Sequence, residues 1–201
     1  VDAPAVTALR TAAASGMATR LLAREDAESL ALLGTGVQAE SHLEAMLAVR
    51  PIKRVFVWGR SREKARAFVE RNSGRAAIEM IAKSDARSAV ERADIVCTVT
   101  SSPSPVLEGR WLRPGTNLNL VGAFTPATRE ADTEAIRRAR VFVEIREFAL
   151  REAGDLMIPI AAGELTRAHV AVHRSRGVED EQDPRAHVVR GVREVALGRV
   201  V

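Results

Sequence analysis

Ser29-Leu30-Ala31-Leu32-Leu33-Gly34-Thr35-Gly36-Val37-Gln38-Ala39-Glu40 is the segment that decides the fold of this chain. A short apolar run stops at a Gly-x-Gly, and a helical pattern begins at once. Because glycine has no Cβ, the backbone can turn tightly here and approach a ligand closely. The free N–H groups at the start of the next helix favour a negatively charged ligand. The segment therefore predicts a site for a dinucleotide pyrophosphate, although Gly-x-Gly also occurs in tight turns without a ligand.

Length and composition are those of a globular chain. Its 201 residues fit one α/β domain, or one domain and a fragment of a second. Hydrophobic residues make up 46% of the chain, which supports a core. We expect no membrane span, because no apolar run of about 18 residues occurs, and no signal peptide is visible. The single cysteine, Cys97, rules out an internal disulfide and agrees with a reducing, cytoplasmic location.

The basic character of the chain does not indicate a nucleic-acid partner. The formal net charge is +4 and the pI is about 10.1, but basic and acidic residues are interleaved without a Lys/Arg block. Aromatic residues amount to 3%, too few for a base-stacking surface. We therefore expect neither nucleic acid nor a membrane among the partners.

Periodic apolar residues and chain breakers divide the sequence into alternating helices and strands. The predicted helices cover residues 7–24, 37–49, 62–71, 84–92 and 128–138, and the predicted strands cover residues 29–33, 54–58, 77–81, 94–99, 117–121 and 141–145. Ser61 is predicted to cap the third helix, and Ser84 or Asp85 the fourth. This alternation predicts an α/β fold, a doubly wound parallel-sheet Rossmann domain with helices on both faces.

The end of the second predicted strand bears on the choice of cofactor. Ligands of such a sheet bind at the carboxyl ends of its strands, where an Asp or Glu accepts a hydrogen bond from the ribose 2′-hydroxyl of NAD. This chain has Gly59-Arg60-Ser61-Arg62 instead, and two guanidinium groups with a hydroxyl suit a 2′-phosphate. NADP(H) is therefore favoured, and NAD(H) stays open. The alternative is that Arg60 and Arg62 are solvated residues at a helix start.

Several stretches together resemble one known family. They are Thr7-Ala8-Leu9-Arg10-Thr11-Ala12-Ala13, Leu33-Gly34-Thr35-Gly36-Val37-Gln38-Ala39, residues 57–61, 93–100 and 114–123, Arg129-Glu130, and residues 154–163. In this order they resemble the ornithine cyclodeaminase/mu-crystallin family over about residues 1–168. The resemblance implies an NAD(P)-binding protein, a homodimer at full length, that acts on small amino or imino acids. Some members are lyases, some are reductases, and some mainly bind their ligands.

The resemblance also implies roles for single residues. Arg10 resembles the arginine that holds the substrate carboxylate, which suits a guanidinium fork, whereas the residues alone would make it a solvated arginine on an alanine-rich helix. Residues that resemble cofactor contacts are Thr11, Gly34, Thr35, Gly36, Val37, Gln38, Thr100, Val121 and Gly122. The last three would line the nicotinamide side. No catalytic residue is identified.

The chain departs from the family pattern at Phe124 and before Thr7. Cyclodeaminases carry an acid/base Asp at the position of Phe124, which cannot transfer a proton. The family's substrate-binding and dimerising portion, with a catalytic lysine, does not precede Thr7 here. We therefore expect residues 1–28 to form a helix linking to a missing substrate/dimerisation domain. Residues 29–168 would be the NAD(P)-binding Rossmann domain, and residues 169–201 an atypical C-terminal tail.

The tail has two interpretations. Val188, Val192 and Val195 recur at helical spacing and predict a terminal amphipathic helix. An end rich in Arg, Val, Gly and His is also what an out-of-frame GC-rich reading would produce. Three histidines, His169, His173 and His187, do not have the spacing of metal ligands. We expect them to lie at the surface and to bind no metal.

Three functions follow from these observations. The leading hypothesis is an oxidoreductase that reduces a cyclic imino acid, such as pyrroline-2-carboxylate, with NADPH. The alternative enzyme is an ornithine cyclodeaminase, a lyase that converts ornithine to proline and ammonia. The third hypothesis is a truncated nucleotide-binding remnant without turnover.

Overall fold

The computed structural model describes residues 3–74, 78–143, 145–170 and 195–200. Its helices are α1 (Ala3–Leu22), α2 (Val37–Val49), α3 (Arg62–Asn72), α4 (Ala86–Val90), α5 (Thr133–Arg138), α6 (Arg146–Glu152) and α7 (Gly154–Ala161). Its strands are β1 (Ser29–Leu33), β2 (Arg54–Trp58), β3 (Glu79–Ala82), β4 (Ile95–Thr98), β5 (Asn117–Leu120), β6 (Ala139–Val143) and β7 (Val195–Val200). Two short 3-10 helices cover Gly109–Trp111 and Arg167–His169.

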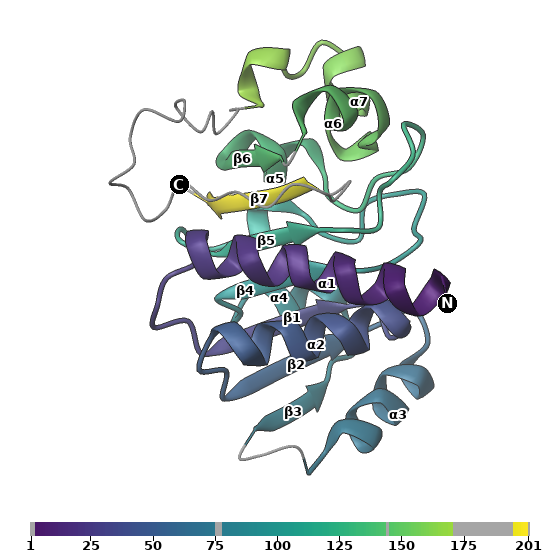
Figure 1. Cartoon of the computed structure of the whole chain (residues 1–201), viewed down its shortest axis with the longest axis vertical. Coiled ribbons are helices and arrows are strands. Elements are labelled where there is room, and N and C mark those ends of the chain that lie inside the picture. The colour runs from purple at the N-terminus through teal and green to yellow at the C-terminus, as the bar shows by residue number, and fades with distance from the viewer. Residues whose placement is uncertain (1–2, 75–77, 144, 171–194, 201) are drawn as a thin grey trace.

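The described strands form a sheet in the order β3-β2-β1-β4-β5-β7-β6 (Figure 1). The first five are parallel, and at their carboxyl ends Leu33 of β1 pairs with Trp58 of β2 and Thr98 of β4. β7 is antiparallel to its neighbours β5 and β6. The chain runs from β1 outward to β3 and then returns to β4 on the other side of β1. This reversal of strand order leaves a crevice at the carboxyl ends of β1 and β4.

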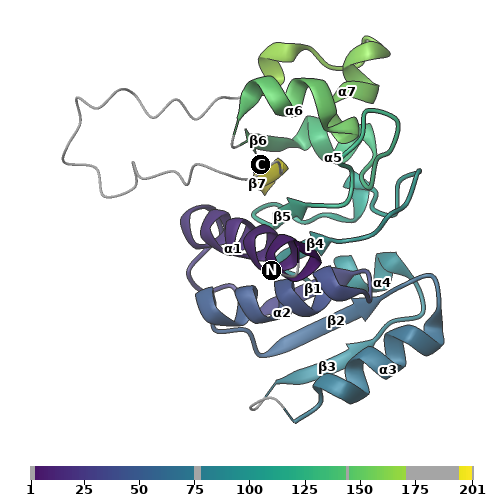
Figure 2. The same cartoon turned by 45° about the vertical axis from the view of Figure 1, so that its right-hand side comes forward.

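Helices cover both faces of the parallel strands, as Figure 2 shows for α2 and α4 on either side of β1. Leu30 and Leu32 of β1 belong to the core beneath α2 and α3. Ala31 and Leu33 belong to the core beneath α4 and α5. All four side chains are fully buried, which is why this strand is a continuous apolar run rather than an alternating one. The predicted α/β fold with a doubly wound parallel sheet is confirmed.

Several predicted boundaries were wrong, and helix capping explains one of them. α1 begins at Ala3 rather than at residue 7 and ends at Leu22 rather than at residue 24. α5 begins at Thr133 and not at residue 128, because the Asp132 side chain accepts the N–H of Ala135 and caps the helix there. β6 covers Ala139–Val143 rather than residues 141–145. The predicted caps Ser61 and Asp85 are confirmed for α3 and α4.

Helices α6 and α7 and strand β7 were not predicted. The predicted terminal helix is wrong at Val195, which begins β7, while Val188 and Val192 lie outside the described residues. Valine favours a strand wherever neighbouring strands supply hydrogen bonds, and here β5 and β6 do so. His169 is half-buried and bonds through Nε2 to the Ile136 carbonyl at 2.7 Å. The tail histidines His173 and His187 lie outside the described residues.

A buried arginine joins the ends of α1 and α2. Arg50 directly follows α2 and is 8% exposed. Its guanidinium donates to five backbone carbonyls, those of Thr19, Arg20, Ala23, Arg24 and Val49, at 2.7–3.0 Å. The last carbonyls of a helix have no partner inside it, and a cation there is favoured by the helix dipole. Arg50 therefore holds the C-terminal end of α1 against α2.

His42 of α2 makes a second link to α1. Its Nδ1 donates to the Gln38 carbonyl at 2.7 Å, because a carbonyl can only accept, and this leaves Nε2 to accept from the Ser15 hydroxyl at 3.0 Å. Burial lowers the pKa of His42 to about 4, so the ring is neutral at pH 7. The neutral ring stabilises the fold above pH 6.5, and this contribution is lost as the pH falls toward 4.

Candidate functional site

A cavity of about 510 Å³ lies at the carboxyl ends of β1, β4 and β5. Its walls come from α1, the loop between β1 and α2, the segments after β4 and β5, and α6 with the start of α7. The predicted site residues that line it are Arg10, Thr11, Gly36, Val37, Gln38, Thr100, Val121 and Gly122. Those that do not are Gly34, Thr35, Arg60, Ser61 and Arg62. The fold thus brings most of the predicted site together.

The two glycines of the loop have different roles. Gly34 has a φ of +133°, and a Cβ there would lie 2.7 Å from the carbonyl oxygen of Val99. Gly34 therefore permits the close approach of the β1 and β4 ends, and this position excludes other residues. Gly36 lines the cavity, and a Cβ there would have no atom of the described residues within 4 Å. Its missing side chain leaves room for a ligand above the start of α2.

Gln38 presents an unsatisfied acceptor beside that opening. Its side-chain oxygen Oε1 is buried and has no hydrogen-bond partner in the described part of the chain. Buried polar atoms are normally hydrogen-bonded, so this atom calls for a donor from a ligand or water. The first N–H groups of α2 have no partner inside the helix either. The first N–H groups of α2, which can donate to an anion, and the unpaired acceptor Oε1 of Gln38 therefore lie close together in the cavity wall.

Helix α1 brings Arg10 and Thr11 to the cavity that the glycine loop also lines. Arg10 is exposed and Thr11 is 4% exposed, and both line the cavity. Gly16 allows the helices to pack closely, since a Cβ there would lie 3.4 Å from the Cβ of Ala45 in α2. With the Arg50 and His42 contacts, this packing fixes where Arg10 lies relative to the loop.

The carboxylate of Glu130 joins the ends of β4 and β5. Oε1 accepts the N–H and the hydroxyl of Thr100, each at 2.6 Å. Oε2 accepts the hydroxyl of Thr98 at 2.7 Å and the N–H of Gly122 at 2.6 Å. Glu130 is fully buried, and burial raises its pKa despite these four bonds. Gly122 must be glycine here, because a Cβ would lie 1.8 Å from the Thr100 carbonyl oxygen.

Asp155, in the first turn of α7, continues this buried network to the cavity. Its Oδ1 accepts the N–H groups of Glu130 and Ala131, both at 2.9 Å. Burial raises the pKa of Asp155 to about 7, and the nearby Glu130 carboxylate adds to the rise. A carboxyl group that is partly protonated near neutral pH therefore lines the cavity.

The turn after β2 lies beside the glycine loop but outside the cavity. A Cβ on Gly59 would lie 3.0 Å from Cγ2 of Thr35, which shows how close the two loops are. Arg60 and Arg62 are exposed, and the Ser61 hydroxyl accepts the N–H of Lys64 as the cap of α3. Within the part of the chain that the structure describes, neither guanidinium group forms an ion pair, and both lie next to the glycine loop in the turn after β2.

Exposed apolar side chains form part of the cavity wall. Phe124 is 69% exposed and Ile145 is 39% exposed, and both line the cavity together with Phe148 of α6. Isolated exposed apolar residues are ordinary, but these share one cavity with the charged Arg10. Such a wall suits a small ligand with one anionic end and an apolar body.

Sequence reasoning missed the contributions of Glu130, Asp155 and α6. In the sequence, Arg129-Glu130 is distinctive only through the family resemblance, and nothing in the local pattern marks either acid as buried. Glu130 bonds Thr98, 32 residues before it, and Asp155, 25 residues after it, so only the folded chain reveals the network.

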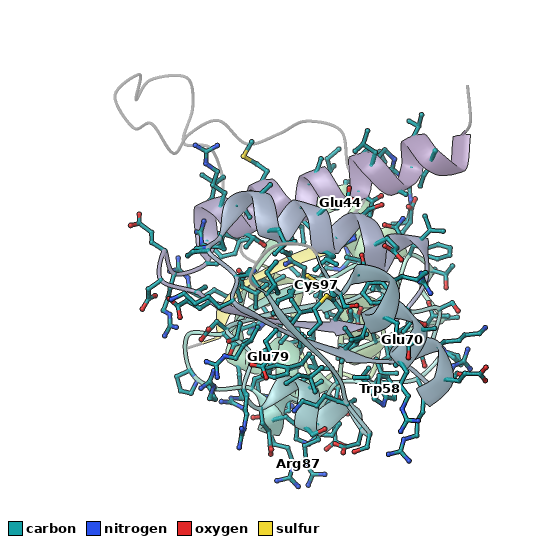
Figure 3. The ribbon with its side chains drawn as sticks, turned by 90° about the horizontal axis from the view of Figure 1, so that it is seen from below. Glu44, Trp58, Glu70, Glu79, Arg87 and Cys97 are labelled. Atoms are coloured by element: carbon teal, nitrogen blue, oxygen red, sulfur yellow. The ribbon has the colours of Figure 1, made fainter. Side chains whose placement is uncertain are left out.

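The described residues contain no cluster of three or more His, Cys, Asp or Glu side chains suited to a metal. Cys97 is fully buried in β4, and Figure 3 shows it in the interior while Arg87 reaches the periphery.

No helix in the part of the chain that the structure describes is both long and apolar enough to cross a membrane.

The strand order, the glycine loop and the cavity at the β1/β4 crevice define a doubly wound α/β domain of the dinucleotide-binding class. The sequence profile of the ornithine cyclodeaminase/mu-crystallin family matches residues 1–199. The chain belongs to this family.

Relatives of known sequence and structure agree with that membership. The chain is 44% identical to the delta(1)-pyrroline-2-carboxylate reductase of Paracoccus denitrificans over 171 residues, 85% of this chain and 54% of the relative. It is 40% identical to the ketimine reductase mu-crystallin of Mus musculus, over 79% of this chain and 49% of the relative. The solved delta(1)-pyrroline-2-carboxylate reductase of Thermococcus litoralis, in complex with NADH and L-proline, matches with a TM-score of 0.80 and 38% identity, over 83% of this chain and 52% of that chain. The chain spans about half the length of these relatives.

Proposed function

We propose that this chain is the nucleotide-binding part of a reductase that converts a cyclic imino acid to the amino acid. The observation that carries the proposal is that residues of the glycine loop and Arg10 line one cavity together. A bound nicotinamide cofactor supplies a hydride, and an arginine at the same cavity suits the carboxylate of a small acid. The relatives named as imino-acid reductases, one of them solved with NADH and L-proline, support the same reaction.

The residues at the start of α2 fit a dinucleotide. The N–H groups after Gly36 would hold the pyrophosphate, and the orphan Oε1 of Gln38 would accept from a ribose hydroxyl. Gly34 and Thr35 would shape that loop, with Val37 and Thr11 at its edges. Thr100, Val121 and Gly122, at the strand ends joined by Glu130, would line the nicotinamide side. In this proposal residues 29–168 form the cofactor domain and residues 1–28 the link to a substrate domain.

We expect the chain to bind NADPH more tightly than NADH. Replacing Arg60 by serine should weaken NADPH binding about tenfold and leave NADH binding unchanged, because a charge-assisted bond to the 2′-phosphate is lost. Isothermal titration calorimetry of the purified chain with each nucleotide measures both. Arg66→Ser is the control and should change neither, because Arg66 is an exposed arginine within α3, beyond the turn that carries Arg60. Tighter NADH binding by the wild-type chain would contradict the assignment of Arg60, Ser61 and Arg62.

Arg10 is expected to act on substrate rather than cofactor. Arg10→Met should lower kcat/KM for pyrroline-2-carboxylate about 10- to 100-fold, since a charged hydrogen-bonding partner of the carboxylate is removed. Binding of NADPH should stay as in the wild type. Arg20→Met, an exposed arginine further along α1, is the matched control. An equal loss of kcat/KM with a substrate analogue that lacks the carboxylate would contradict this role of Arg10.

Phe124 favours reduction over cyclodeamination. A lyase of this family type needs an acid/base group where the chain places an exposed aromatic ring. The deciding assay compares NADPH oxidation with pyrroline-2-carboxylate against ammonia release from L-ornithine. Ammonia release alone would support the cyclodeaminase. Nucleotide binding without either reaction would support a binding remnant, and no nucleotide binding at all would refute the whole proposal.

A homodimer is the assembly we propose for the full-length protein, in keeping with an archaeal alanine dehydrogenase dimer of 31% identity and TM-score 0.78. A cytoplasmic location belongs to the same proposal. Light scattering of the purified protein tests the assembly.

A further inference from the structure

The two carboxyl oxygens of Asp155 differ in their hydrogen bonds within the described residues. Oδ1 accepts both N–H groups, those of Glu130 and Ala131. Oδ2 takes part in no hydrogen bond among the described residues, and Asp155 lines the cavity although the residue is only 3% exposed. Two N–H donors on one oxygen leave the other to carry a proton. Asp155 is therefore built as a carboxylic acid whose O–H would face the cavity.

The charged surroundings of Asp155 come from three other elements. The Glu130 carboxylate, on the segment before α5, raises the pKa of Asp155, and Arg129 beside it lowers that pKa. Glu152 of α6 and Arg10 of α1 line the same cavity. Because burial outweighs the stabilising bonds, the pKa of Asp155 lies at about 7. An acid of this pKa is matched to proton transfer near neutral pH.

The acidic and basic groups at or near the cavity differ from Asp155 in how their atoms are used. Both oxygens of Glu130 accept two hydrogen bonds each, so neither can carry a proton without losing one. The Thr100 hydroxyl donates to Glu130. Glu152 is held by Arg151 at 2.7 Å. A guanidinium does not give up its proton in a protein, which excludes Arg10.

We propose that Asp155 donates the proton in imine reduction, a role that rests on the function proposed above. The C=N π bond breaks; its carbon receives the hydride that NADPH supplies, and its nitrogen receives the proton from Oδ2. The electron pair of the O–H bond stays on Asp155 as a carboxylate, and water at the cavity mouth returns the proton. NADPH is oxidised and the imine is reduced by the same two electrons.

The test is Asp155→Asn in the full chain. Asparagine keeps an acceptor for the two N–H groups and loses the transferable proton. We expect kcat/KM for pyrroline-2-carboxylate at pH 7 to fall about 100-fold or more while the Kd for NADPH stays unchanged. The wild-type kcat/KM should decline as the pH rises above about 7, because Asp155 loses its proton. This alkaline limb of the pH profile should be absent from the variant. Glu147→Gln, an exposed carboxylate on α6, is the control and should keep both the rate and the limb.

A second readout does not need turnover. Infrared titration of the chain without nucleotide should show a carboxyl C=O band that disappears near pH 7 in the wild type and is missing from Asp155→Asn. The absence of that band from the wild type overturns the proposal, even if the variant does not fold. So does a variant with wild-type kcat/KM and an unchanged limb. A wild-type chain that binds NADPH but reduces no imine would instead refute the proposed function, and the donor role with it.

Discussion

Replacing Glu130 by glutamine is expected to lower the free energy of unfolding by about 3–5 kcal/mol. The carboxylate accepts four hydrogen bonds in a fully buried position, from Thr98, Thr100 and Gly122. A glutamine amide would turn two N–H donors toward groups that are themselves donors, so buried partners would stay unsatisfied. Because those partners end β4 and β5, the carboxyl ends of the two strands should separate. Urea unfolding followed by circular dichroism measures the loss.

Glu134→Gln is the matched control for this prediction. Glu134 is on α5, close in sequence, and pairs with Arg137 at 2.6 Å with its side chain 43% exposed. Exposed ion pairs contribute about 1 kcal/mol or less, so the control should unfold almost as the wild type does. If Glu130→Gln unfolded at the same urea concentration as the wild type, packing alone would hold the strand ends together.

Replacing Arg50 by methionine is expected to cost about 3–4 kcal/mol, because hydrogen bonds to a charged group are lost and buried carbonyls are left without donors. Three of the five carbonyls belong to the last turn of α1 or the residue after it, namely Thr19, Arg20 and Ala23. Methionine keeps the length and the apolar stem of the side chain, so the change isolates the guanidinium. Hydrogen exchange should accelerate mainly along α1, and the cavity wall carrying Arg10 should loosen with it.

Arg92→Met serves as the control, since Arg92 is exposed between α4 and β4. Surface substitutions of this kind change stability by about 0.5 kcal/mol or less. Unchanged exchange along α1 in Arg50→Met would mean that the Gly16–Ala45 packing and the His42–Ser15 bond position the helix without Arg50.

Local sequence patterns were sufficient to predict the parallel strands β1 to β5 and the helices between them. Leu30–Leu33 is a strand because both faces are buried, and Ser61 and Asp85 begin helices because each side chain accepts an N–H within one turn. These signals act over a few residues and are therefore visible in sequence. The start of α5 and the strand at Val195 were mispredicted. A strand forms only where neighbours supply hydrogen bonds, and β5 and β6, the neighbours of β7, are far away in the chain.

The sequence by itself determined the fold class, the glycine loop and the family resemblance, because periodicity, turn chemistry and motif order are local properties of the chain. Only the tertiary structure decided which residues share a cavity. Arg10 lines the same cavity as Gly36 because Arg50 and His42 dock α1 on α2. Asp155 lies near the strand ends because its carboxyl group accepts the backbone N–H of Glu130. Contacts between distant segments depend on packing of the whole domain, and so does the burial that raises the pKa of Asp155.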